Sequence, residues 1–153
     1  YMDAIYVIPP VAASVFFIFL YSLFSTIEYY YQKTGFIAIA TCICAVLNLI
    51  LNYFGIKMYG YYAAGYTTLI CYVGLALLHY VFYKKALKEV GNEEKMYDVK
   101  LIVFQSAIVI AIMIIMALTY SQTWIRYGLL VAIVCIVIIF RNKIFEAISE
   151  LRK

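Results

Sequence analysis

Apolar runs about as long as a bilayer is thick recur along the chain, and they constrain its fold more than any other feature. A helix needs about 20 apolar residues to cross a hydrocarbon core about 30 Å thick. Five segments approach that length, and they cover residues 4–31, 35–54, 59–83, 101–118 and 124–140. Helices can cross lipid because they satisfy their own backbone hydrogen bonds. We therefore expect an all-α, polytopic membrane protein with about five transmembrane helices.

The composition excludes a water-soluble domain. Hydrophobic residues make up 67% of the chain and charged residues 13%, against about 45–50% and 25% in soluble domains. A soluble domain of about 150 residues still exposes around 30% of its unfolded surface, which is too much for such a chain. The net charge of +4 comes from loops beside the membrane, so it gives no reason to expect a nucleic-acid partner.

The basic residues predict an orientation, because cytoplasmic loops collect Lys and Arg. One set of alternating connections holds only Lys57 and Arg126. The other set holds Lys33, Lys84, Lys85, Lys88, Lys95, Lys100, Arg141, Lys143, Arg152 and Lys153. We therefore expect an external N-terminus and a cytoplasmic C-terminus.

The chain divides into four expected parts. Residues 1–85 would hold three core helices, and 86–100 a cytoplasmic loop. Residues 101–140 would hold two accessory helices that face lipid, since they carry almost no polar side chains. The last part, 141–153, would be an amphipathic helix along the inner surface. Pro9 and Pro10 favour a start of the first regular helix near Val11, because proline lacks a backbone donor and clashes one turn back.

Small and polar side chains form a stripe on the second expected helix. Its members recur at spacings of three or four, which place them on one face: Thr34, Ala38, Thr41, Ala45, Asn48 and Asn52. Small residues let membrane helices approach closely, so we expect Thr41 and Ala45 to pack against a neighbour. An unpaired amide in hydrocarbon is costly, so Asn48 and Asn52 either bond to another helix or line a polar cavity that contacts a transported head group.

The third expected helix carries a similar pattern. Gly60, Ala64 and Thr68 recur at four-residue steps and predict a second close-packing face. Gly55 and Gly60 bracket FGIKMYG, which we expect to be a short external turn because glycine relieves a tight backbone.

Two ionisable residues within the apolar runs have open interpretations. Glu28 lies near the end of the first segment, where it could snorkel to the inner interface or face the bundle as part of an ion or proton relay. His79, the only histidine, is interpreted first as an interfacial or packed side chain and second as a proton carrier.

No pattern predicts a metal, a cofactor or an enzyme. Cys42, Cys44, Cys71 and Cys135 lie inside apolar runs without C-x-x-C spacing or a histidine partner, so they are expected to be small buried side chains. A membrane enzyme would need clustered carboxylates, histidines or a metal site. We expect neither cofactor nor catalytic residues.

The stretch NLILNYFGIKMYGYYAAGYTTL resembles a known family pattern, in which an asparagine-bearing helix is followed by a Gly-containing turn and a helix that opens Gly-x-x-Ala-Ala. The preceding YSLFSTIEYYYQKTGFIAIAT is similar to the same family. The family is the oligosaccharide flippases of the multidrug/oligosaccharidyl-lipid/polysaccharide exporter superfamily, and the resemblance covers about residues 6–85. Members carry about 12–14 helices in two bundles, so the resemblance, together with Tyr1 in place of an initiating methionine, leads us to expect the C-terminal portion of a longer chain.

The resemblance implies an activity without covalent chemistry. Such proteins translocate undecaprenyl-pyrophosphate-linked oligosaccharide from the inner to the outer leaflet of the bacterial plasma membrane by alternating access. The implied partners are this lipid-linked oligosaccharide, membrane lipids and the remaining helices of the full-length chain. Asn48, Asn52 and Glu28 are the substrate-pathway candidates. An ion-coupled multidrug antiporter of the same superfamily and a non-catalytic structural membrane subunit remain as alternatives.

Overall fold

The computed structural model describes residues 2–91 and 97–119, together with five single positions between 124 and 138. A 3-10 helix, η1 (Met2–Val7), precedes four α-helices: α1 (Ile8–Tyr30), α2 (Thr34–Tyr59), α3 (Ala63–Glu89) and α4 (Val99–Thr119). The expected fifth helix, apart from those single positions, and the expected amphipathic tail lie outside the described residues. The chain forms two compact units, Tyr1–Ala117 and Leu118–Lys153. The first unit holds η1, α1, α2, α3 and α4 as far as Ala117.

Four helices in the described part are long and apolar enough to cross a membrane. The spans Ile5–Tyr30, Thr34–Tyr59, Ala63–Glu89 and Val99–Thr119 have mean hydropathies of 2.1, 2.3, 1.4 and 2.8. The described residues are helical or lie in turns and bends. An all-helical membrane protein is therefore confirmed, with four of the expected crossings described.

The first helix begins earlier than the two prolines suggest. The predicted start near Val11 is wrong, because α1 begins at Ile8 and places Pro9 and Pro10 in its first turn. Proline is tolerated there because the first N–H groups of a helix have no partner within the helix. Both prolines are buried, so they also form part of the packed interior.

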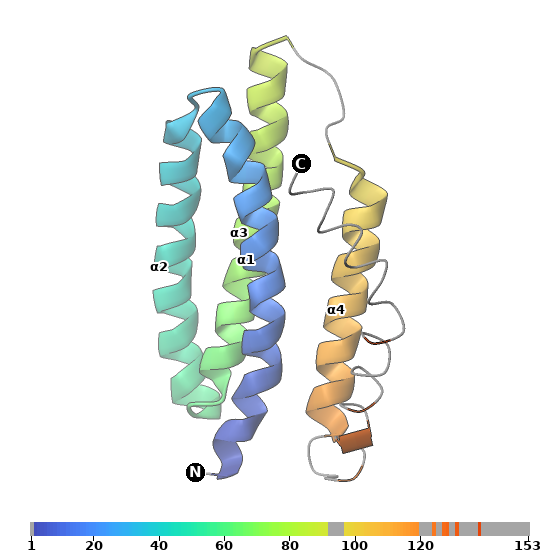
Figure 1. Ribbon diagram of the computed structural model, residues 1–153. Coiled ribbons are helices and arrows are strands. Elements are labelled where there is room, and N and C mark those ends of the chain that lie inside the picture. The colour runs from blue at the N-terminus through green and yellow to red at the C-terminus, as the bar shows by residue number, and fades with distance from the viewer. Residues whose placement is uncertain are drawn as a thin grey trace. The chain divides into compact units, whose positions relative to one another are not determined.

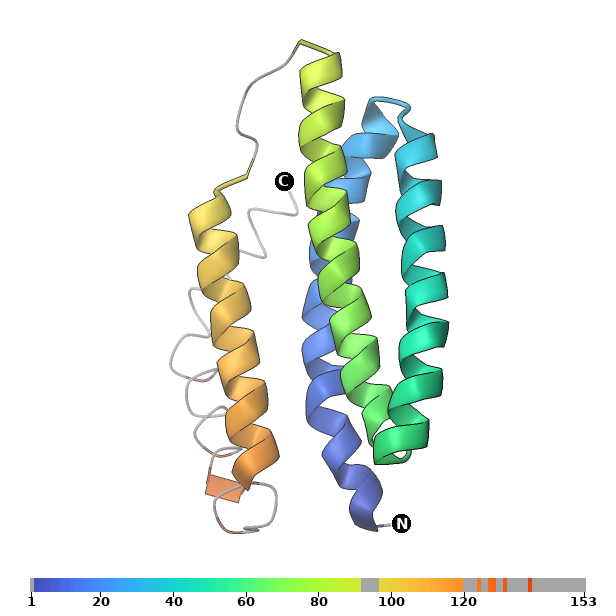
Figure 2. The ribbon, with the colours of Figure 1, turned by 180° about the vertical axis from the view of Figure 1, so that it is seen from behind.

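Helices α1, α2 and α3 form a three-helix bundle. Its core lies between α1 and α3, which run side by side in both views (Figures 1 and 2). A hydrophobic stripe on α1 faces a stripe on α3, and its buried members are Ala13, Phe17, Leu20, Phe24, Ile27, Leu69, Ala76, Tyr83 and Leu87. Aromatic rings fill the end of this contact near the α1–α2 turn. The Phe24 and Tyr83 rings stack with centroids 5.7 Å apart, and Tyr97 packs edge-on to Phe24.

The second helix packs on α3 through a face adjacent to the predicted stripe. Its buried residues are Ala40 and Cys44, which pack against Leu75. Thr41 and Ala45 are exposed and lie outside this buried contact, so their packing against a neighbouring helix stays a prediction. Ala40 and Cys44 are about as small as the stripe residues, and they allow the same close approach.

The turn between α2 and α3 lies later in the chain than predicted. FGIKMYG is not a loop, because α2 continues to Tyr59 and the turn comprises residues 60–62. Gly60 ends α2 with φ 80°, a left-handed conformation that glycine adopts readily. Gly60 is therefore a turn residue, and its predicted place in a packing face of α3 is wrong.

The last described helix contacts the bundle loosely. No residue of α4 is buried, although Ile102, Val109, Ile110 and Met113 are half-buried against the α1–α3 core. The connection before α4 is shorter than the predicted loop over 86–100, because α3 extends to Glu89.

Candidate functional site

A carboxylate and an imidazole meet inside the bundle. Glu28 on α1 and His79 on α3 both have fully buried side chains, with 0% exposure. The Nδ1 atom of His79 lies 2.9 Å from Oε1 of Glu28. The interpretation of Glu28 as a snorkelling side chain is therefore wrong, whereas His79 is a packed side chain, which is one form of its first interpretation. Glu28 faces the bundle instead.

Two aromatic rings stack beside the imidazole of the pair. The Tyr21 ring on α1 stacks on the His79 imidazole with centroids 5.6 Å apart, and the Tyr72 ring on α3 stacks on Tyr21 at 6.5 Å. Two polar atoms of the pair, Oε2 of Glu28 and Nε2 of His79, are buried without a hydrogen-bond partner. Such atoms are rare in folded proteins and often mark a site with a chemical role.

Helical periodicity explains why these two side chains point inward. Glu28 follows Leu20 and Phe24 at steps of four, on the buried face of α1. His79 lies four residues after Leu75 and four before Tyr83, on the buried face of α3. The sequence contained this signal, because both residues fall within apolar stripes rather than between them.

A partly exposed ion pair lies at the end of the bundle that holds the α1–α2 turn. The Nζ atom of Lys33, in the α1–α2 turn, lies 2.6 Å from Oε2 of Glu89 at the end of α3. Both side chains are about one-third exposed. Glu28 therefore has a nearby basic residue that is already engaged by another carboxylate.

The two asparagines form a hydrogen-bonded chain between α2 and α3. The Nδ2 of Asn52 donates to Oδ1 of Asn48 at 2.7 Å, and Oγ1 of Thr67 donates to Oδ1 of Asn52 at 2.6 Å. Thr67 is also 3.0 Å from the carbonyl oxygen of Ala63. The interhelical bond expected for the asparagines is thus present, and it ends on Thr67. Ala64 and Thr68, which were predicted to belong to a close-packing face, are half-buried.

Asn48 also lines an open groove of about 520 Å³ between α2 and α3. The other lining residues are Thr41, Cys44, Ala45, Leu49, Thr68, Cys71, Tyr72 and Leu75. Thr41, Asn48 and Thr68 bring hydroxyl and amide groups to an otherwise apolar wall. Asn48 is half-buried, and its side chain both bonds to Asn52 and lines the groove.

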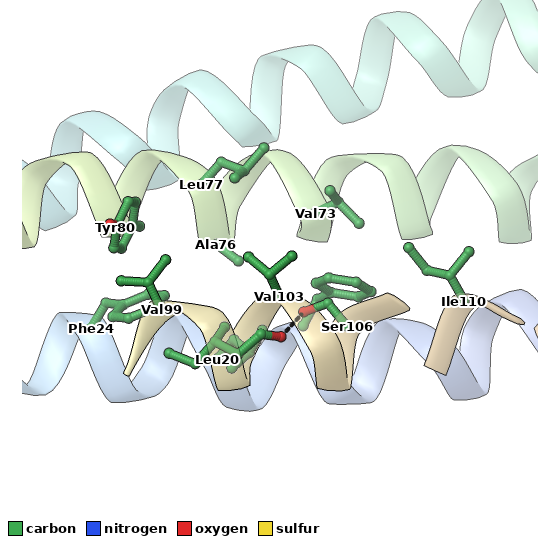
Figure 3. Close-up of a pocket in the computed structure, with 12 residues that line it drawn as sticks. Leu20, Phe24, Val73, Ala76, Leu77, Tyr80, Val99, Val103, Ser106 and Ile110 are labelled. Carbon is green, nitrogen blue, oxygen red and sulfur yellow. Dashed lines mark hydrogen bonds between the residues drawn. The ribbon is translucent and has the colours of Figure 1, made fainter. Parts of the chain in front are cut away.

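A second cavity is almost wholly apolar. It has a volume of about 240 Å³ and lies where α1, α3 and α4 meet. Figure 3 shows Val103 of α4 and Ala76 of α3 facing one another across it. Tyr80 and Ser106 are the lining residues that carry hydroxyls, and the Ser106 hydroxyl donates to the carbonyl oxygen of Ile102 at 2.8 Å. This cavity suits a hydrocarbon chain and offers no chemistry of its own.

Within the described residues, no cluster of three or more His, Cys, Asp or Glu side chains could hold a metal ion. Cys44 and Cys71 are buried free thiols, Cys42 is exposed, and Cys135 lies outside the described residues. Cys42 thus departs from the expectation of buried cysteines.

No protein-family model, curated protein or solved structure matches this chain.

Proposed function

We propose that the chain is part of a flippase that moves undecaprenyl-pyrophosphate-linked oligosaccharide from the inner to the outer leaflet of a bacterial plasma membrane. Two features support the proposal. The resemblance of residues 48–69 to such proteins suggests the cargo. The groove beside Asn48 supplies polar groups on the wall of an apolar helix pair, and this groove is the observation that carries the proposal.

The groove addresses the physical problem of such transport. A sugar head loses its hydration on entering hydrocarbon, and the loss is offset only where hydrogen-bonding groups replace water. Asn48 uses its amide oxygen to accept from Asn52, and an asparagine amide also carries two N–H donors. With the hydroxyls of Thr41 and Thr68, these donors would contact sugar hydroxyls while the polyprenyl tail stays in lipid. Alternating access would expose the groove to each side in turn.

Deletion of the full-length gene tests the proposal. We expect lipid-linked oligosaccharide to accumulate in the cytoplasmic leaflet and surface polysaccharide to fall. Complementation should restore both with the wild-type gene and with the control Leu47→Ile, because Leu47 is 45% exposed, does not line the groove, and stays apolar after the change. Complementation by Asn48→Leu should be weaker. Unchanged surface polysaccharide in the deletion strain would contradict the proposal.

One observation favours a second candidate, an ion-coupled multidrug antiporter of the same superfamily. Such an antiporter needs an acidic residue deep in a bundle, and Glu28 is a fully buried carboxylate. In that case the deletion strain would become more sensitive to cationic compounds while its surface polysaccharide stayed normal. The same strain therefore separates the two candidates.

A further inference from the structure

We propose that Glu28 and His79 together form a binding site for one proton, and that its occupancy determines whether α1 and α3 stay in contact at this level. The link to transport rests on the proposed function, because the proton would then drive the separation of helices in a transport cycle. The site itself rests only on the contact between α1 and α3.

Charge counting shows why the proton matters. Neutral histidine always carries one ring proton, and the pair can bind one further proton on either side chain. With that further proton the pair has no net charge, either as carboxylate and imidazolium or as carboxylic acid and imidazole. Loss of that proton leaves a net charge of −1, and gain of another leaves +1. A net charge in a site with 0% exposure is strongly disfavoured, because no water solvates it. The closed contact therefore selects the singly protonated pair.

The two unpartnered atoms indicate where the site opens. The bond between Nδ1 and Oε1 satisfies one atom of each side chain, whereas Oε2 of Glu28 and Nε2 of His79 have no partner. In every protonation state, at least one buried polar atom lacks a hydrogen bond. Water that entered between α1 and α3 would satisfy both atoms and solvate the net charge, so release of the proton and separation of the helices favour each other.

The other charged and titratable groups on the packed elements do not replace this proton. The nearby ammonium of Lys33 and the carboxylate of Glu89 bind one another. The remaining described groups at buried or half-buried positions are thiols and phenols: Tyr21 on α1, Tyr31 directly after it, Cys44 on α2, Tyr62 in the α2–α3 turn, Cys71, Tyr72, Tyr80 and Tyr83 on α3, and Tyr97 before α4. Lys84 and Lys85 are exposed, with their amines over the Tyr80 and Phe36 rings. Glu28 and His79 are thus the described pair whose charge changes inside the bundle.

Hydrogen–deuterium exchange on the purified full-length protein in lipid nanodiscs tests the site. Exchange of backbone amides in 20–31 and 72–86 would be followed from about pH 3.5 to about pH 9, a range that includes the reference pKa values of free glutamate and histidine side chains, and corrected for intrinsic rates. We expect protection in the wild type to be greatest at an intermediate pH and to fall by roughly tenfold or more toward each extreme.

Two variants, each of which removes one ionisable group, separate the acidic loss of protection from the alkaline loss. In Glu28→Gln, a neutral amide oxygen accepts from Nδ1–H without any net charge, so the alkaline loss of protection should disappear while the acidic loss remains. In His79→Gln, the carboxylate remains and the imidazolium is gone, so the alkaline loss should remain and the acidic loss should disappear. Asp98→Asn, which changes an exposed carboxylate before α4, should behave as the wild type.

A wild-type profile that is flat after correction would overturn the proposal, and this result needs no variant to fold. An alkaline loss that persists in Glu28→Gln would overturn it as well. The readout requires no cargo, so it is independent of the flippase test. If protection falls at both pH extremes but deletion of the gene leaves surface polysaccharide normal, the proton site is supported and the flippase proposal is rejected. If the profile is flat but deletion lowers surface polysaccharide, the flippase proposal is supported and the proton site is rejected.

Discussion

At the scale of single residues, Gly65 sets how closely α3 approaches the start of α1. A Cβ atom added at Gly65 would lie 2.8 Å from Cγ1 of Val7 and 3.2 Å from both Cγ of Pro10 and the carbonyl oxygen of Val7. Real Cβ atoms almost never come within 3.0 Å of another heavy atom. The contact between α3 and the segment around the two prolines therefore depends on a missing side chain.

We predict that Gly65→Ala destabilises the protein by about 1–3 kcal/mol, because the added methyl overpacks this contact. Gly74→Ala is the matched control in the same helix, since a Cβ there would meet nothing within 4 Å. It should be neutral or stabilising by up to about 1 kcal/mol, the ordinary preference of a helix for alanine. Thermal unfolding of the purified variants in detergent measures both changes. Equal stability of the two variants would contradict the close approach at Gly65.

The residues that could be placed well from the sequence are those whose chemistry leaves little choice. An amide in hydrocarbon needs a partner, so an interhelical bond from Asn48 or Asn52 could be expected from the residue type alone, and Asn52 makes one. Glu28 was harder, because a long carboxylate near a helix end can either snorkel or turn inward. Distance along the helix does not separate these outcomes, whereas the position of Glu28 in the Leu20–Phe24 stripe does.

At the scale of elements, the contact between α2 and α3 depends on Asn52 more than on Asn48. The side chain of Asn52 makes two bonds in the network, one to Asn48 and one to Thr67 on the other helix. The bond of Asn48 within this network lies inside α2 and does not itself join the two helices.

We predict that Asn52→Leu destabilises the protein by about 1–2 kcal/mol and Asn48→Leu by about 0.6 kcal/mol, since side-chain bonds between membrane helices contribute about 0.6 kcal/mol on average and at most about 1.7. The loss of stability in Asn52→Leu should not exceed this range, because Thr67 can still donate to the carbonyl oxygen of Ala63. Leu49→Ile, at an exposed position, should be neutral. Resistance of the purified variants to thermal unfolding gives the ranking, and a larger loss for Asn48→Leu would reverse the assignment.

Element boundaries were predictable to within about six residues, with the largest difference at the end of α3, which was expected at residue 83 and lies at Glu89. At two other boundaries, local rules left two solutions. Two prolines either end a helix or occupy its first turn, and α1 uses the second solution. Gly55 and Gly60 both allow a turn, but only Gly60 has a positive φ, so α2 runs past Gly55. The face of α2 that packs on α3 was not predictable, for a different reason. Ala40 and Cys44 are also small, and composition alone does not select between two adjacent faces of an apolar helix.

At the scale of the whole molecule, the all-helical membrane architecture followed from the sequence, whereas the pairing of helices did not. Apolar length predicts how many helices cross a bilayer, and lipid is as apolar as leucine, so hydrophobicity does not distinguish a protein-facing side from a lipid-facing side. Glu28 and His79 are 51 positions apart in the chain. Only the packing of α1 on α3 brings them together, and no pattern within either helix names the other as its partner.

The orientation of the bundle leads to a prediction for intact cells. Lys57 lies in the last turn of α2 and Lys88 in the last turn of α3. These helices are antiparallel neighbours joined by a short turn, so the two lysines lie at opposite ends of the bundle (Figure 1). Because basic residues collect on the cytoplasmic side, the end that holds Lys84, Lys85 and Lys88 should face inward.

Single cysteines introduced as Lys57→Cys and Lys88→Cys, in a background without native cysteines, report this orientation. Both positions are exposed, so each should react with a maleimide wherever the reagent has access. We predict that an impermeant maleimide labels Lys57→Cys in intact cells and labels Lys88→Cys only after the membrane is opened. Removal of the native thiols is required because Cys42 is itself exposed. Labelling of Lys88→Cys from outside would contradict this orientation and place the end of α3 on the external side. Each end of the groove beside Asn48 would then face the compartment opposite to the one expected here.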